Sequence, residues 1–254
     1  MASLMLASLA CNVSNIPNPF ATDTPTPTLT FTPSPTFTPS PTATAISTPT
    51  STPLPTGVTT EAKSDGTSIF IDYDNKYQLV LPKNWMVIPI SQKDFSIAAD
   101  QIAKENPKLA KALLAFKDLD PKVFRGVALY SDEKYLFKNY ATNMSITAFE
   151  DETLNSMPLA FISAILEDTF KNNGAKILTS GVNIINNKHK VEVEYIDYVQ
   201  NINVNGNVLV IQARAMLFQN NNKLIMVQVA MPKQFSNDIL PIAETIGATI
   251  ELLK

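Results

Sequence analysis

The single histidine, His189, is the side chain best suited to acid–base or metal chemistry in this sequence. It follows Asn186-Asn187 and precedes two acidic residues of the same expected strand, Glu192 and Glu194. A histidine with an acidic neighbour could hold a metal, but protein metal sites normally use three or four convergent ligands. An exposed histidine in a turn is therefore the favoured interpretation, and no metal or other cofactor is expected.

Other catalytic patterns are weak. Nucleophilic catalysis would need a serine beside that histidine or beside another base, and no Gly-x-Ser-x-Gly pattern occurs. The chain has seven glycines, which are too scattered to form a phosphate-binding loop. We therefore expect a protein that is not an enzyme, with no catalytic residue to name.

Three carboxylate groupings have both a chemical and a structural interpretation. Asp72-x-Asp74-Asn75 has a faint calcium-loop spacing, but Lys76 stands where a ligand oxygen is needed, so a hairpin turn is favoured. The acidic run 150–152 could bind a cation or a partner, yet negative charge is also favourable near a helix N-terminus. Glu167 and Asp168 are expected to face solvent.

Trp85 is the only tryptophan in the chain. It could line a ligand groove, because indole rings present a large apolar face with one polar edge. The favoured interpretation is burial, as the anchor of the turn formed by Leu81-Pro82-Lys83-Asn84-Trp85.

The elements that position these residues begin near residue 68. Residues 69–73 and 77–81 alternate as a hairpin, and residues 123–130 and 143–149 form two further strands. Between them, residues 94–117 have helical periodicity that Pro107 must interrupt. We expect two helices here, with Asn106 as the N-cap of the second.

The second half predicts a central helix and a run of strands. The helix spans about 157–173, with Ser156 as N-cap, Pro158 in its first turn and Gly174 after its end. Strands are expected at 177–185, 188–198, 208–218 and 224–230, joined by Asn- and Gly-rich turns, with a last helix at 234–246 and a strand at 248–252. The fold class is α+β, an antiparallel meander with helices packed on it.

The N-terminal quarter has a different composition. Eleven of the 18 prolines lie between Pro17 and Pro55, Lys and Arg are absent before Lys63, and Thr-Phe-Thr-Pro-Ser-Pro occurs twice in succession from Thr30. Prolines fix the backbone angle and remove amide donors, so such a tract is expected to be disordered and extended. The sequence predicts residues 12–66 as a spacer and residues 67–254 as a single domain.

Cys11 is the only cysteine and ends the short apolar run 1–11. This run resembles the end of a bacterial lipoprotein signal, in which small residues precede a cysteine that is lipidated. It lacks a positive N-terminal region and is shorter than a normal signal peptide, as it would be if the true start lay upstream. We expect Cys11 to be a lipidation site and to hold the domain outside the membrane, the alternative being a secreted protein.

The segment Tyr77-Gln78-Leu79-Val80-Leu81-Pro82-Lys83-Asn84-Trp85 resembles the opening signature of PsbP-like domains, in which a strand ends in a Leu-Pro-x-x-Trp turn. The helix ending at Asn173-Gly174, the long strands after it and the closing Ile250-Glu251-Leu252 strand are similar to that family too. The resemblance implies an α/β/α sandwich with a central antiparallel sheet. Its members include photosystem accessory subunits, Ran-binding proteins of the Mog type and bacterial lipoproteins, which mostly bind partners. No functional residue is carried over.

Three functions stay open at this point. The favoured one is a non-catalytic, lipid-anchored extracytoplasmic protein that binds another protein or an envelope component. The second is a carrier of a small ligand, which predicts an apolar pocket with a few polar groups. The third is a hydrolase, which predicts clustered titratable groups in a cleft. With 20 basic and 23 acidic residues, the charge balance gives no reason to expect nucleic acid as a partner.

Overall fold

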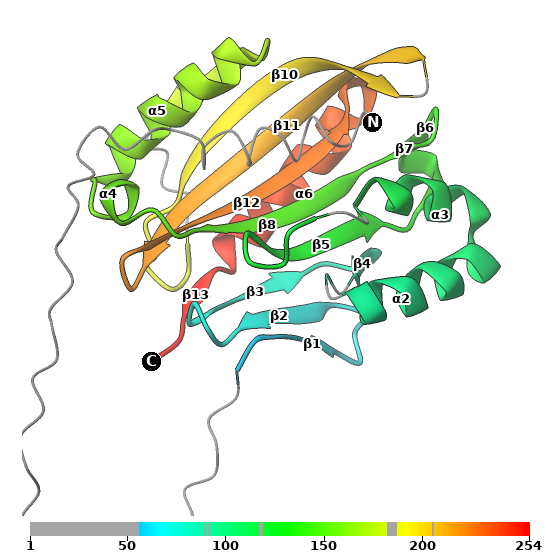
Figure 1. Ribbon diagram of the computed structural model, residues 1–254, viewed down its shortest axis with the longest axis horizontal. Coiled ribbons are helices and arrows are strands. Elements are labelled where there is room, and N and C mark those ends of the chain that lie inside the picture. Colours follow the sequence, from blue (N-terminus) through cyan, green and yellow to red (C-terminus); the bar gives the residue numbers. More distant parts are fainter. Residues whose placement is uncertain (1–55, 89, 91, 117–118, 182–186, 205) are drawn as a thin grey trace, which may run out of the picture. The chain divides into compact units, whose positions relative to one another are not determined.

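The computed structural model describes residues 56–88, 90, 92–116, 119–181, 187–204 and 206–254. Cys11 and the expected signal and spacer up to residue 55 lie outside the described residues. Within the described part, the centre of the fold is a seven-stranded antiparallel sheet in the order β4-β5-β8-β12-β11-β10-β9 (Figure 1). Its strands are β4 (Trp85–Ile88), β5 (Phe124–Tyr130), β8 (Asn143–Phe149), β9 (Lys176–Gly181), β10 (Glu194–Val204), β11 (Asn207–Asn220) and β12 (Lys223–Pro232).

The four C-terminal strands of this sheet form the expected meander. Alternate side chains of β11 face opposite layers, because successive residues of a strand point to opposite sides. Leu209, Ile211 and Ala213 belong to the core under one face, whereas Met216 and Phe218 belong to the core under the other. Asn221 and Asn222 adopt positive φ angles of 48° and 56° in the turn to β12, the conformation that a tight hairpin of this kind requires.

Helices cover one face of the large sheet at both ends. The central helix α5 (Leu159–Asn172) packs Leu159, Ile162, Leu166 and Phe170 onto the strands β10 to β12. At the other end, α2 (Gln92–Glu105) and α3 (Pro107–Leu113) bury Ile102, Leu109 and Leu113 against β4 and β5. Asn106 caps α3 by accepting hydrogen bonds from the amides of Lys108 and Leu109, as the sequence predicts.

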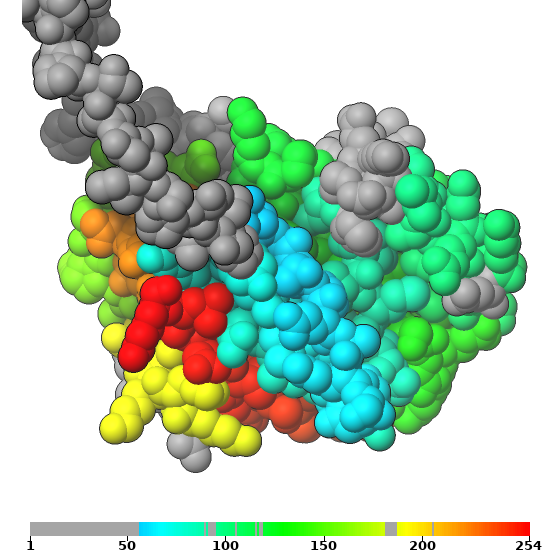
Figure 2. Space-filling view, turned by 90° about the horizontal axis from the view of Figure 1, so that it is seen from below, coloured from blue at the N-terminus to red at the C-terminus, as the bar shows by residue number. Residues whose placement is uncertain are grey.

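The opposite face is covered by α6 (Ser236–Ala248) together with a second, four-stranded sheet, β1-β2-β3-β13. The strands of the small sheet are β1 (Val58–Ala62), β2 (Ser68–Asp72), β3 (Tyr77–Leu81) and β13 (Glu251–Leu252). Figure 2 shows β1 in blue across one face of the domain, between the red C-terminal residues and the green helices α2 and α3. The α/β/α sandwich is therefore present, and a small sheet shares one of its outer layers.

One short α-helix, three turns of 3-10 helix at Leu114–Phe116, Glu133–Tyr135 and Lys233–Phe235, and one short ribbon complete the described secondary structure. The segment α4 (Glu152–Asn155) precedes α5, and Asp151 caps it through the amide of Leu154. Ser156 ends α4 and does not cap α5, whose N-cap position is Pro158. The two-residue strands β6 (Leu136–Phe137) and β7 (Tyr140–Ala141) pair with each other.

Two expectations about boundaries are wrong. The domain does not begin at residue 67, because Val58–Ala62 forms β1 and pairs along its whole length with β2. Its sequence, Val-Thr-Thr-Glu-Ala, is as polar as the preceding tract and therefore did not indicate a strand. The strand is held in place by its backbone pairing with β2. The start expected for the strand at residue 188 is wrong too, whereas residues 182–186 of the expected strand and turn lie outside the described residues. Asn187 is buried, and β10 begins only at Glu194.

Candidate functional site

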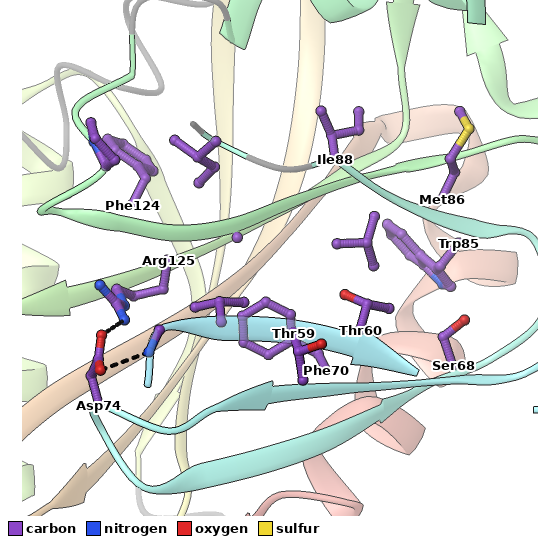
Figure 3. A pocket seen from close by; sticks show the side chains of 16 residues that line it. Thr59, Thr60, Ser68, Phe70, Asp74, Trp85, Met86, Ile88, Phe124 and Arg125 are labelled. Atoms are coloured by element: carbon purple, nitrogen blue, oxygen red, sulfur yellow. Dashed lines mark hydrogen bonds and ion pairs between the residues drawn. The ribbon is translucent and has the colours of Figure 1, made fainter. Parts of the chain in front are cut away.

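A groove lies between the small sheet and the free edge of the large sheet, with a volume of about 690 Å³. One wall is the inner side of β1 and β2, and the other is β4 with the beginning of β5 (Figure 3). The lining is mainly apolar and aromatic, with a charged group at one end. It consists of Gly57, Val58, Thr59, Thr60, Ser68, Phe70, Asp74, Trp85, Met86, Val87, Ile88, Ile90, Pro121, Phe124, Arg125 and Gly126.

Side chains from both faces of β4 line the groove. Trp85 and Val87 belong to the core beneath α6 and the small sheet, whereas Met86 and Ile88 pack towards α2 and α3. Figure 3 shows Trp85 directed towards Thr60 and Ser68, on the other side of the strand from Ile88. Since residues of opposite faces meet the same space, the backbone edge of β4 itself faces the groove.

The floor of the groove is a close contact between the two sheets. Gly126 of β5 lies against the ring of Phe70 of β2, and a Cβ at this glycine would come within 2.6 Å of Phe70 Cε2. Real Cβ atoms do not approach carbon atoms so closely, so a side chain at position 126 would push the sheets apart. The phenyl ring therefore fixes the depth of the groove.

Arg125 closes one end of the groove. Its Nε donates to Asp72 Oδ2 at 2.8 Å and its Nη2 donates to Asp72 Oδ1 at 3.0 Å. The same Nη2 donates to Asp74 Oδ2 at 2.6 Å. Asp72 is fully buried, so this two-point pairing supplies the charge compensation that a buried carboxylate needs. We call Arg125, Asp72 and Asp74 the inter-sheet clamp.

The clamp is braced by the hairpin that carries the carboxylates. Asp72 also accepts from the Asn75 amide at 3.1 Å and from Asn75 Nδ2 at 2.6 Å. Asp74 Oδ1 accepts from the Gly57 amide at 2.8 Å, at the start of β1. The Gly57 amide, followed by Arg125, holds the pKa of Asp74 below its ordinary value. Two carboxylates against one guanidinium leave one net negative charge, and the Asp74 side chain is 42 % exposed.

Trp85 is both the buried anchor and a lining residue of the groove, so its two interpretations hold together. It is 6 % exposed, and its ring meets that of Tyr130 edge to face at a centroid distance of 5.2 Å. Its Nε1 finds no hydrogen-bond acceptor among the described residues. This nitrogen has almost no exposed surface, so it does not present a donor to the groove.

The residues that sequence suggested for metal or acid–base chemistry do not come together. His189 is an exposed turn residue, and its Nδ1 lies 3.8 Å from Glu251 rather than beside Glu192 or Glu194. Glu194 is instead buried at 1 % exposure on the face that α5 covers. No cluster of three metal-ligating side chains occurs among the described residues.

The other acidic candidates have structural partners. Asp72 and Asp74 face Arg125 and therefore do not form a calcium loop. Asp151 caps α4, and Asp168 pairs with Lys171 at 3.2 Å on the exposed side of α5. Ser131 and Lys134 have a Ser-x-x-Lys spacing, but the Lys134 amine pairs with Asp238 at 2.9 Å, which keeps the pKa of Lys134 above its ordinary value.

Sequence reasoning missed Arg125, which is the residue that organises the site. The one signal was a lone arginine in the otherwise uncharged strand Phe-Arg-Gly-Val-Ala-Leu-Tyr. A charged side chain in such a strand needs a buried partner or an exit to solvent. Its partners lie 53 and 51 residues away, so local sequence could not name them.

No family model matches the chain, and no curated protein matches it. Among solved structures, it is similar to the solution structure of cyanobacterial PsbP (CyanoP) from Synechocystis sp. PCC 6803, at 14 % identity and a TM-score of 0.47, over 75 % of this chain and 94 % of that one. It is also similar to LpqN of Mycobacterium tuberculosis, described as involved in cell envelope biogenesis, at 11 % identity and a TM-score of 0.41, over 78 % of this chain and 91 % of that one.

A PsbP structure is thus among those to which the domain is similar, in agreement with the resemblance found in the Leu-Pro-x-x-Trp segment. The likeness concerns the fold and says nothing about what the groove holds. Among the described helices, none is long and apolar enough to cross a membrane.

Proposed function

We propose that this chain is a non-catalytic binding protein, lipid-anchored at Cys11 outside the cell membrane, whose domain holds part of a protein or envelope component in the groove between β1 and β4. The observation that carries the proposal is the groove itself: an apolar, partly open space of about 690 Å³ beside a free strand edge. Concave apolar sites with a few polar groups are the usual form of binding sites.

Binding is favoured over catalysis because the charged groups of the groove are held by hydrogen bonds to one another and to the neighbouring backbone. Arg125 is bound by Asp72 and Asp74, and each carboxylate has further donors from Asn75 or Gly57. A general base needs a proton acceptor that is poised near the working pH and within reach of the substrate. The lowered pKa of Asp74 makes it a poor proton acceptor at neutral pH.

The tether supports presentation at a distance from a membrane. An extended chain reaches about 3.1 Å per residue, so roughly 45 residues of Thr/Pro-rich spacer could span on the order of 140 Å. That reach would carry the domain beyond the headgroup layer. A test is metabolic labelling of intact cells with a fatty-acid analogue. Label should enter the wild-type protein and be absent from Cys11→Ser, and equal labelling would remove the anchor from the proposal.

For the groove, we suggest photo-crosslinking in intact cells. A photoreactive amino acid at Val58, which is 39 % exposed and lines the groove, should give a discrete crosslinked species. The matched control is the same amino acid at Val208, which is 66 % exposed on β11 and is not part of the groove lining. Equal products from both positions, or none from Val58, would contradict the proposal.

A small-ligand carrier is the second candidate, favoured by the groove volume, which lies within the range of about 300–1,000 Å³ seen for small-molecule sites. Native mass spectrometry of the purified full chain separates the two. A bound molecule of a few hundred daltons that is lost in Phe70→Ala would support the carrier.

A further inference from the structure

The edge of β4 differs from the other free edges of the two main sheets in the described part of the chain. Those edges are β4 and β9 in the large sheet and β1 and β13 in the small one. β1 and β13 each carry a glutamate, Glu61 and Glu251, and β9 carries Lys176. Charged residues on an edge discourage another strand from pairing with it. β4, with the sequence Trp-Met-Val-Ile, carries none.

The neighbouring strand β5 continues past the end of β4. β4 has four residues and pairs only with Val127–Tyr130, whereas β5 begins three residues earlier, at Phe124. Phe124, Arg125 and Gly126 therefore have no partner on the β4 side among the described strands, and all three line the groove. At about 3.3 Å per residue, β4 offers about 13 Å of strand edge, and the start of β5 is set back from that edge by one strand spacing of about 4.8 Å.

The groove provides for both the backbone and the side chains of an added strand. An extended segment beside β4 would place alternate side chains to either side, as successive residues of a strand point in opposite directions. One set would meet Phe70 and Val58 on the small sheet, and the other would meet Met86 and Ile88.

The charge at the end of the groove indicates which side chain the occupant carries there. The inter-sheet clamp carries one net negative charge, and the exposed part of Asp74 lies at the groove. A basic side chain at one end of the segment would complement it, and like charge there would oppose binding.

From this arrangement we propose that the groove binds an extended peptide segment of a partner protein, which pairs as a strand with the free edge of β4 and places a basic residue at Asp74. This deepens the proposed function and rests on it. Strand addition draws affinity from main-chain hydrogen bonds and specificity from pockets for alternate side chains.

The test uses the full chain and peptides of defined composition. The probe is acetyl-Lys-Val-Thr-Val-Thr-Val-amide, with a second peptide that carries the lysine at the other end, since the direction of the added strand sets which end reaches Asp74. Trp85 is the single tryptophan, so its fluorescence reports occupancy of the groove without a label. Hydrogen exchange measured in the same samples reports pairing at β4.

Three matched comparisons define the expected result. One peptide should change Trp85 fluorescence and slow exchange at the amides of β4. Its analogue with alternate backbone amides N-methylated should bind at least about tenfold more weakly, since two or more hydrogen bonds are removed while the side chains stay. Replacing its lysine by glutamine should weaken binding to the wild type about two- to fivefold and should leave binding to Asp74→Asn unchanged.

Protein variants locate the effect. Ile90→Asp places a charge in the groove lining and should abolish binding, whereas Val208→Asp should bind as the wild type does. Equal thermal unfolding of the two variants confirms that both are folded.

Several outcomes would overturn the inference. These are equal affinity of the N-methylated peptide, binding without protection of β4, occupancy by a small apolar molecule, occupancy by a Thr/Pro-rich segment of the chain itself, and pairing of β4 with a second copy to give a dimer. A groove-dependent crosslink at Val58 without any peptide binding would leave the proposed function standing and remove the strand-addition mode alone.

Discussion

Arg125 of β5 and Asp72 of β2 join the two sheets of the domain through two hydrogen bonds of 2.8 and 3.0 Å. The aspartate is buried and belongs to the small sheet, whereas the arginine is half-buried and belongs to the large one. This ion pair therefore contributes to the relative position of the sheets at one end of the groove, together with the hydrogen bonds from Asn220 Nδ2 to the carbonyl oxygens of Asn75 and Lys76.

Loss of that pair should be costly. Arg125→Ala leaves the buried Asp72 carboxylate without its counter-charge, for which we expect a loss of about 3–5 kcal/mol in the free energy of unfolding. Urea unfolding measures it. The control is Lys108→Ala, because Lys108 pairs with Glu133 at 2.9 Å on the surface, and exposed pairs contribute about 0–1 kcal/mol. A similar small loss in both variants would show that the clamp does not hold the sheets.

Gly126→Ala should destabilise the domain by about 1–3 kcal/mol, because the added methyl group meets Phe70 at 2.6 Å and forces the sheets to shift. Phe70→Leu removes the colliding ring atoms, at the cost of a smaller core residue. We therefore expect the double variant to be more stable than the sum of the two single changes predicts. A double-mutant cycle by thermal unfolding measures the difference, and strict additivity would contradict the contact.

Glu194 should make stability depend on pH. Burial raises the pKa of Glu194 above its ordinary value of 4.5, since the charged form is poorly solvated. The folded state then binds the proton more tightly than the unfolded state. The resulting stabilisation is fully present below about pH 4.5 and is lost as the pH rises through the folded pKa.

The variant Glu194→Gln removes this titration. Relative to the wild type, it should gain stability progressively from about pH 4.5 upwards and keep the gain at pH 7. Glu150→Gln, a change at an exposed position, is the control. Urea unfolding across this pH range gives both curves, and parallel curves for wild type and Glu194→Gln would falsify the assignment.

Asn187 should contribute more to the stability of the domain than an ordinary turn residue does. Its Nδ2 donates to the carbonyl oxygens of Gly247 at 2.9 Å and Ile250 at 3.0 Å, and its Oδ1 accepts from the His189 amide at 2.8 Å. Asn187→Ala leaves buried backbone groups unpaired at the end of α6, for which we expect a loss of about 2–3 kcal/mol. The exposed Asn201→Ala should lose less than about 0.5 kcal/mol, measured by the same unfolding experiment.

Local signals predicted the elements whose ends are set by single residues. Asn106 and Pro107 begin α3, and Gly174 adopts a φ of 83° just beyond α5, because capping and left-handed turns depend on neighbouring backbone groups alone. The polar strand β1 gave no such signal, since its place in the sheet comes from pairing with β2.

From the sequence, only the alternative interpretation of Trp85 as a groove-lining residue pointed to the groove. Its walls are formed by segments that lie tens of residues apart in the sequence. Its charged end is formed by Asp72 and Arg125, which are 53 residues apart. Asn187 is a residue whose local sequence suggested the wrong role. Its neighbour Asn186 made it look like part of a turn, whereas its partners lie 60 and 63 residues away.

The attachment of Gly57 has a mechanical consequence. The residue that follows the N-terminal tract is held by Asp74 through its amide and by the Tyr73 amide through its carbonyl oxygen, at 2.8 and 2.9 Å. Any pull on the chain before Gly57 is therefore borne first by the hairpin that also carries Asp72, and then by Arg125. The same few hydrogen bonds thus connect the start of the described chain to the groove, so tension applied before Gly57 would act on the groove before it reaches the rest of the domain.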